Sequence, residues 1–106
     1  MKRSIFGRNP QDGQPIEVIV DDGRVRAIVP ARADQEWWLS PGLIDLQVNG
    51  FGGHDVNADG VDADVIHSLT KKMIATGVTT YLPTIITASE EKITAALRAI
   101  AEADGP

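Results

Sequence analysis

The sequence predicts a mixed α/β fold, and three observations lead to this prediction. Two short apolar runs flank the dipeptide Asp22-Gly23, which is typical of a β-hairpin because both residues tolerate positive φ. A third apolar run, residues 43–48, has the length of a buried strand and ends at a glycine-rich segment. Two stretches with helical spacing of apolar residues lie further along the chain, separated by one more strand. The predicted order is a set of strands over residues 1–40, then strand, helix, strand and helix over residues 41–106.

Residues 1–40 are expected to form a β-meander. Strands are predicted at residues 4–6, 17–20 and 25–29, and Asn9-Pro-Gln-Asp-Gly13 has the composition of a second turn. Taken alone, the pattern describes a small independent sheet with an open edge. Such an edge favours association with other chains.

The first helix is predicted over residues 62–76. Asp62 and Asp64 suit its first turn and Gly77 suits its C-terminal end. Its apolar residues at helical spacing are Val65, Ile66, Leu69, Met73 and Ile74. A strand over residues 78–86 is expected next, with a bulge or an interrupted ladder at Pro83.

The second helix is predicted to begin at a capping box formed by Thr87 and Glu90. Its expected apolar stripe consists of Ile93, Ala96, Leu97, Ile100 and Ala101. The alternation of strand and helix predicts two parallel strands joined by a right-handed crossover.

The most informative segment is Pro41-Gly-Leu-Ile-Asp-Leu-Gln-Val-Asn-Gly-Phe-Gly-Gly-His-Asp55. Gln47 and Asn49 lie two residues apart at the end of the predicted strand, so their side chains are expected on the same side. At the carboxyl end of a parallel β/α strand, inward polar side chains are usually functional. The alternative is that both amides satisfy backbone groups of the loop, and the sequence favours neither.

This segment resembles the first barrel strand of the amidohydrolase superfamily, Pro-Gly-x-Ile-Asp-x-His-x-His, with Gln47 and Asn49 in place of the two histidines. The exchange and the following glycines are similar to the single-metal N-acetylglucosamine-6-phosphate deacetylase family. Thr79-Thr-Tyr-Leu-Pro-Thr-Ile-Ile-Thr87 resembles the second barrel strand of the same family. The resemblance implies the N-terminal part of a small β-sandwich (residues 1–40), followed by the first two β/α units of an incomplete TIM-like barrel (residues 41–106). A complete barrel takes about 250 residues, so the 106 residues are expected to be an N-terminal fragment.

The same resemblance implies metal-dependent hydrolysis of an N-acetyl group in amino-sugar catabolism. The family's metal ligands, a glutamate and two histidines, and its proton-shuttling aspartate match nothing in these residues, so no catalytic residue and no metal ligand is predicted here. Zinc or a similar divalent metal is a cofactor of the complete enzyme only, and the isolated chain is expected to be inactive. The predicted role of this chain is to line the substrate cleft, with Gln47, Asn49, Gly50 and His54.

Other histidines and acids give weaker signals. His54 with one carboxylate falls far short of a zinc shell, and His67 is expected on the first helix, exposed or half-buried. The acidic residues lack the spacing of a calcium loop, and a solvated loop and helix start explain them better. They are Asp55, Asp59, Asp62 and Asp64.

Composition restricts the possible partners. A net charge of −5 and scattered basic residues disfavour nucleic acid and anionic membranes, and the absence of cysteine excludes disulfides and thiolate metal sites. No apolar stretch has the length of a membrane span or a secretory signal, so cytoplasm is the expected compartment. The expected partners are an amino-sugar phosphate substrate in the complete enzyme and further copies of the chain. The alternatives are a non-catalytic α/β domain for protein association and a fragment of another amidohydrolase.

Overall fold

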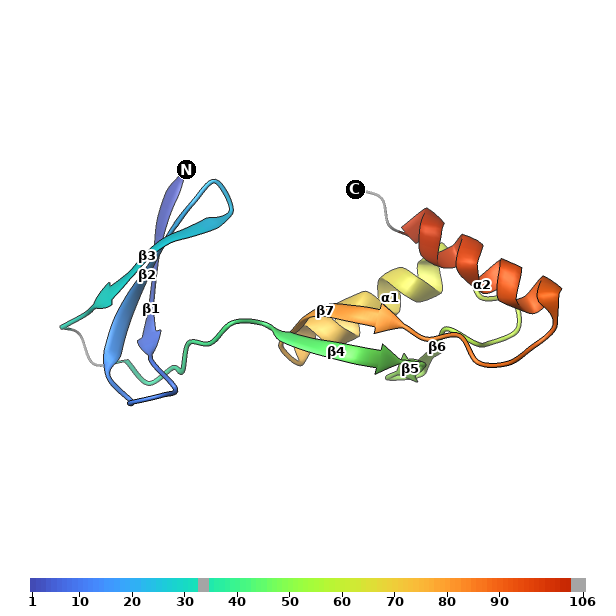
Figure 1. Ribbon diagram of the computed structural model, residues 1–106, viewed down its shortest axis with the longest axis horizontal. Helices are drawn as coiled ribbons and strands as arrows, with labels where there is room; N and C mark the ends of the chain where they lie inside the picture. Colours follow the sequence, from blue (N-terminus) through green and yellow to red (C-terminus); the bar gives the residue numbers. More distant parts are fainter. Residues whose placement is uncertain (33–34, 104–106) are drawn as a thin grey trace. The chain divides into compact units, whose positions relative to one another are not determined.

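The computed structural model describes residues 1–32 and 35–103, and the chain divides into two compact units, Met1–Pro41 and Gly42–Pro106. Among the described residues, the first unit holds a three-stranded sheet, and the second holds strands and two helices (Figure 1). The mixed α/β prediction is confirmed.

The first unit is an antiparallel sheet in the order β1-β2-β3, with β1 at Lys2–Arg8, β2 at Pro15–Asp21 and β3 at Arg24–Pro30. The predicted hairpin between β2 and β3 is confirmed, because Asp22 and Gly23 both have positive φ, 50° and 69°. Between β1 and β2, the backbone N–H of Gln11 donates to Asn9 Oδ1 at 3.0 Å, as expected for a turn residue of this type. The three strands are each longer than the sequence predicts.

The second unit is built on two parallel strands, β4 (Leu43–Val48) and β7 (Val78–Pro83). Helix α1 (Ala63–Ala75) connects them and helix α2 (Glu90–Ala103) follows β7, which is the predicted alternation (Figure 1). A short hairpin of β5 (Gly50–Phe51) and β6 (His54–Asp55) lies between β4 and α1. Both strands therefore end on the same side of this small sheet, as parallel strands must.

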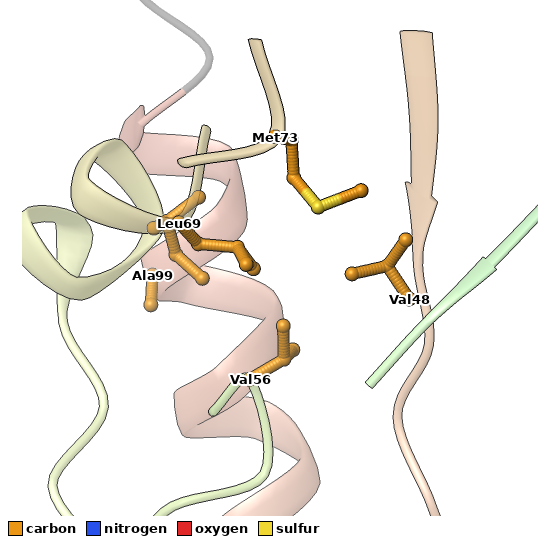
Figure 2. Packing of buried hydrophobic residues seen from close by; sticks show 6 residues of the cluster. Val48, Val56, Leu69, Met73 and Ala99 are labelled. Atoms are coloured by element: carbon orange, nitrogen blue, oxygen red, sulfur yellow. The ribbon is translucent and has the colours of Figure 1, made fainter. Parts of the chain in front are cut away.

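The apolar core of the second unit joins β4 to both helices. Figure 2 shows Met73 of α1 and Val48 of β4 pointing toward each other, with Leu69 and Ala99 on the helical side. Leu69 and Val56 have no exposed surface at all. Burying a leucine side chain contributes about 1.5–3 kcal/mol. The fully buried Leu69 therefore makes the contact between the helices a main source of this unit's stability.

The first helix begins and ends where the sequence predicts. Asp62 is its N-cap, and the Asp62 carboxylate accepts a hydrogen bond from the backbone N–H of Val65 at 3.0 Å. Gly77 follows the helix with φ of 90°, the left-handed conformation that ends many helices. No helix within the described residues is long and apolar enough to cross a membrane.

The second helix differs from its prediction at the start and along its face. Its first turn is capped by Ser89, whose hydroxyl accepts from the backbone N–H of Lys92 at 3.3 Å, and not by Thr87. Ala96 of the predicted stripe is buried and Ile100 packs against the core, but Leu97 is exposed. Ala99, which the predicted stripe did not include, is buried instead, so the buried face is rotated toward it.

The predicted second barrel strand is also shorter than expected. It ends at Pro83 instead of residue 86, and the pairing with β4 shifts register between Asp45 and Val48. The irregularity expected at Pro83 is therefore present, because proline has no N–H to continue the ladder.

Candidate functional site

Three polar residues at alternate positions lie in and just beyond β4. Asp45, Gln47 and Asn49 line one hollow of about 180 Å³ together with Val48, Gly50, Phe51 and Met73. Alternation along a strand favours the same side for the three polar side chains, whereas Val48 and Met73 belong to the core. Asp45 is half-buried, and its carboxylate accepts a hydrogen bond from the backbone N–H of Gln47 at 3.1 Å. Gln47 is exposed, and its side chain bonds to no other described residue.

The glycine-rich segment after β4 forms a tight hairpin rather than an irregular loop. Gly52 and Gly53 occupy its two turn positions with φ of 60° and 87°, which suits the two-residue turns of twisted strands. A Cβ atom on Gly52 would meet the Lys72 side chain at 3.3 Å, so the turn lies against the aliphatic stem of a residue of α1. The hairpin is therefore held in a fixed place beside the end of β4.

The hairpin places His54 next to the same strand end. His54 is half-buried and lines a second, open hollow with Asn49, Gly50 and Phe51. Asn49 and Gly50 contribute to both hollows, whereas Gln47 and His54 do not share one. Of the four residues predicted to line a cleft, Asn49 and Gly50 thus line both hollows, and Gln47 and His54 line one each.

The side chain of Asn49 also ties the two parallel strands together. Its Nδ2 donates to the backbone carbonyl of Thr84, just beyond β7, at 3.2 Å. The backbone N–H of Thr84 in turn donates to the carbonyl of Val48 at 2.8 Å. The donor end of the Asn49 amide therefore satisfies a backbone group, as in the alternative interpretation, while Gln47 makes no such bond.

Asn57, which sequence reasoning missed, joins the same carbonyl. Asn57 Nδ2 donates to the Thr84 carbonyl at 3.0 Å, and Asn57 Oδ1 accepts from the backbone N–H of Ile86 at 2.9 Å. A side-chain amide that donates and accepts in this way replaces one step of a β-ladder. It explains how the Thr84 carbonyl and the Ile86 N–H keep hydrogen-bond partners beyond the end of β7. Nothing in a single sequence marks Asn57 for this role.

No three His, Asp or Glu side chains come close enough to hold a metal in the part of the chain that the structure describes. His67 is on α1, where its Nε2 contacts the carbonyl of Ala103 at 3.2 Å. Its role differs from that of His54. The acids have local partners: Asp62 caps α1, Asp59 pairs with Lys92 at 3.0 Å, and Asp55 accepts from the Asn57 backbone at 2.8 Å. Their structural roles agree with a loop and a helix start.

The fold and the site together define an α/β protein with polar side chains gathered where two parallel strands end. Such strand ends are where α/β proteins bind ligands. No family model matches the chain. The comparisons with individual proteins are specific.

The chain is similar over most of its length to N-acetylglucosamine-6-phosphate deacetylases. It is 31% identical to the enzyme of Haemophilus influenzae over 91 residues, which are 86% of this chain and 24% of that protein. It is 42% identical to the enzyme of Caenorhabditis elegans over 57 residues, 50% of this chain and 14% of that protein. The crystal structure of the deacetylase from Pasteurella multocida matches with a TM-score of 0.68 at 28% identity, over 83% of this chain and 25% of that one. The chain thus spans about a quarter of the length of the two bacterial proteins and a smaller share of the Caenorhabditis elegans protein.

Proposed function

We propose that this chain forms the N-terminal part of an N-acetylglucosamine-6-phosphate deacetylase and supplies one wall of its substrate cleft. The observation that carries the proposal is the pair Gln47 and Asn49 at the carboxyl end of β4, inside the region of likeness to these deacetylases. In the complete enzyme the reaction is metal-dependent hydrolysis of the N-acetyl group, a step of amino-sugar catabolism. The proposed compartment is the cytoplasm.

The second unit, in this proposal, is the first two β/α units of a TIM-like barrel. The parallel pairing of β4 with β7 supports it, and so do the apolar side chains that stay exposed on these strands. Leu43, Ile44, Leu46 and Leu82 are all more than half exposed. Neighbouring strands and helices of a barrel would bury such residues, and the three-stranded sheet would belong to a β-sandwich beside it.

The polar side chains at the end of β4 are poor ligands for a transition metal. Gln47 and Asn49 offer neutral amides, which bind a transition metal far less well than imidazole or carboxylate. We therefore assign both side chains to hydrogen bonding of the substrate. Gln47, with a free amide, can both donate and accept. The divalent metal belongs to other parts of the complete enzyme, so these 106 residues should release no acetate.

The test is a titration of the chain with N-acetylglucosamine 6-phosphate, followed by NMR of the side-chain amides. We expect the Gln47 and Asn49 signals to shift, with a dissociation constant on the order of 1 mM because one wall of a cleft provides few contacts. Asn9 and Gln14, in the turn between β1 and β2 of the first unit, serve as controls that should not shift. No change at Gln47 and Asn49 up to tens of millimolar would contradict the proposal, as would acetate release by the isolated chain.

A second candidate function is a non-catalytic domain that associates with proteins, most simply with further copies of this chain. The exposed apolar residues of β4 and the sheet edges favour it. Sedimentation distinguishes a strictly monomeric species from an associating one across a range of concentrations. A monomer at all concentrations would exclude self-association and leave the cleft-wall proposal unaffected.

A further inference from the structure

The carbonyl of Thr84 is the point where three separate segments of the second unit meet. It accepts two side-chain hydrogen bonds, from Asn49 at 3.2 Å and from Asn57 at 3.0 Å. A carbonyl oxygen has two lone pairs, so the two amides saturate it. The donors lie 35 and 27 residues away in the sequence, which means that the contact exists only in the folded chain.

Both ends of the Asn57 side-chain amide form hydrogen bonds with the segment 84–86. Besides donating to Thr84, it accepts from the backbone N–H of Ile86 at 2.9 Å, so the segment 84–86 is fixed on either side of Ile85. The segment around Asn57 is itself anchored, because the backbone N–H of Val56 donates to the carbonyl of Asn49 at 2.9 Å. Val56 is completely buried in the core. The clasp, defined as Asn49, Asn57 and Thr84, is therefore attached to rigid structure.

The clasp determines which end of the Asn49 amide is free. Thr84 offers a carbonyl, which can only accept, so the amide must turn its NH₂ toward it. Asn49 Oδ1 accepts no hydrogen bond from any residue that the structure describes. Asn49 lines both hollows at the end of β4.

We propose that Asn57 is a positioning residue, which acts through the Thr84 carbonyl to hold Asn49 with its side-chain oxygen free for a ligand. The wall at the end of β4 then offers a hydrogen-bond acceptor at Asn49 and selects ligand groups that carry a proton, such as a hydroxyl or an amide N–H. Gln47 lacks such a restraint and can present either end. This inference rests on the proposed function for the identity of the ligand, but the positioning itself does not depend on it.

The test compares three forms of the full chain by NMR, with no ligand present. In Asn57→Ala, hydrogen exchange of the Asn49 side-chain amide and of the Ile86 backbone amide should each accelerate about two- to tenfold, the range that one lost hydrogen bond produces. In Asn57→Asp, the acceptor for Ile86 remains and the donor to Thr84 is lost. Ile86 should therefore stay protected while the Asn49 side chain exchanges faster.

The Asn57→Asp variant separates positioning from a simple tether of the loop. A tether would be preserved in that variant, and the Asn49 side chain would exchange as in the unchanged chain, which would overturn the proposal. Asn9→Ala, which removes one hydrogen bond in the first unit, is the matched control and should leave Asn49 unaffected. Circular dichroism verifies that each variant is folded. Because no substrate or turnover enters the measurement, a failure of the deacetylase proposal would not change its outcome.

Discussion

The two units of the chain both contain hydrogen-bonded strands but bury very different amounts of apolar surface. In the first unit, seven residue pairs join β1 to β2 in unbroken register. Yet all buried hydrophobic residues within the described ranges lie in the second unit, between Val48 and Ala99. Hydrogen bonds between strands set register and direction, but burial of apolar surface supplies most of the stability. The first unit is therefore a regular hydrogen-bonded sheet without an apolar core of its own.

One face of this sheet is apolar and lacks a layer that would cover it. The pairing places Ile5, Val18 and Ile28 in one row across the three strands. They line an open apolar hollow of about 640 Å³. On the opposite face, Ser4 donates a hydrogen bond to Glu17, and the register places Phe6, Ile19 and Val29 on that face as well. A sheet with an uncovered apolar face needs a second layer, as in a sandwich, which agrees with the proposal that it belongs to a larger protein.

The largest expected effect comes from removing part of the core that only the second unit has. Leu69→Ala should lower the free energy of unfolding by about 2–5 kcal/mol, because it leaves a cavity at a fully buried position. Helix content in circular dichroism reports the second unit, and fluorescence of Trp37 and Trp38 reports the first. The denaturation midpoint should fall clearly when unfolding is followed by the helix signal, and much less when it is followed by tryptophan fluorescence.

Two matched substitutions check this interpretation. Leu97→Ala on the exposed face of α2 and Ile28→Ala on the sheet should each cost less than about 1 kcal/mol. If Leu69→Ala lowered the denaturation midpoint equally by both signals, the two units would unfold together. That result would contradict the difference in stability expected between them.

The next effect concerns local opening. Backbone amides of α1 around Leu69 should exchange about 100-fold more slowly, relative to an unfolded chain, than those of β1 to β3, because protection follows burial as well as hydrogen bonding. Native-state hydrogen exchange measured by NMR gives both values in one experiment. Similar protection in the sheet would show that its apolar face is covered in solution, as self-association would do.

The contrast also explains which parts of the fold could be predicted. The hairpin at Asp22-Gly23 and the start of α1 at Asp62 depend on neighbouring residues, and both predictions are confirmed. The start of α2 was harder to predict, because Thr87 and Ser89 both suit a helix N-cap. In the structure the hydroxyl of Ser89 accepts from the backbone N–H of Lys92, and the helix begins after Ser89. The local pattern cannot distinguish between two such candidates that lie two residues apart.

The candidate site likewise has one feature that the sequence could predict and one that it could not. Alternation along a strand predicted that Gln47 and Asn49 share a side, and both line one hollow. The clasp could not be predicted, because its central acceptor is a main-chain carbonyl. Every residue has such a group, so the sequence does not identify the one that is used. Its donors come from segments that only the parallel pairing of β4 and β7 brings together. Whether these residues bind substrate stays a prediction.

A smaller effect is expected where the two parallel strands begin. A Cβ atom at Gly42 would overlap the side chain of Thr79, so Gly42→Ala forces the strands apart. Overpacking of this kind costs about 1–3 kcal/mol. Urea denaturation followed by circular dichroism measures the loss. The backbone of Gly42 does not have positive φ, so a loss would be due to crowding and not to backbone strain. Unchanged stability would mean that β4 and β7 adjust at this end, and that the close approach is not a constraint on the sheet.

The smallest effect is expected at the ion pair between Lys92 and Asp59. The two groups are 3.0 Å apart and join α2 to the loop before α1, but the Asp59 side chain is 95% exposed. Water and salt screen such a pair, and ordering two mobile side chains offsets most of its attraction. Asp59→Asn should therefore change the melting temperature by less than about 3 °C, and the difference should vanish in 1 M salt. Thermal melts at low and high salt provide the measurement, with Asp12→Asn in the first unit as the control. A larger, salt-independent loss would mean that the contact between the second unit's elements depends on charge as well as on the core around Leu69, and the contrast between the two units would then need an electrostatic component.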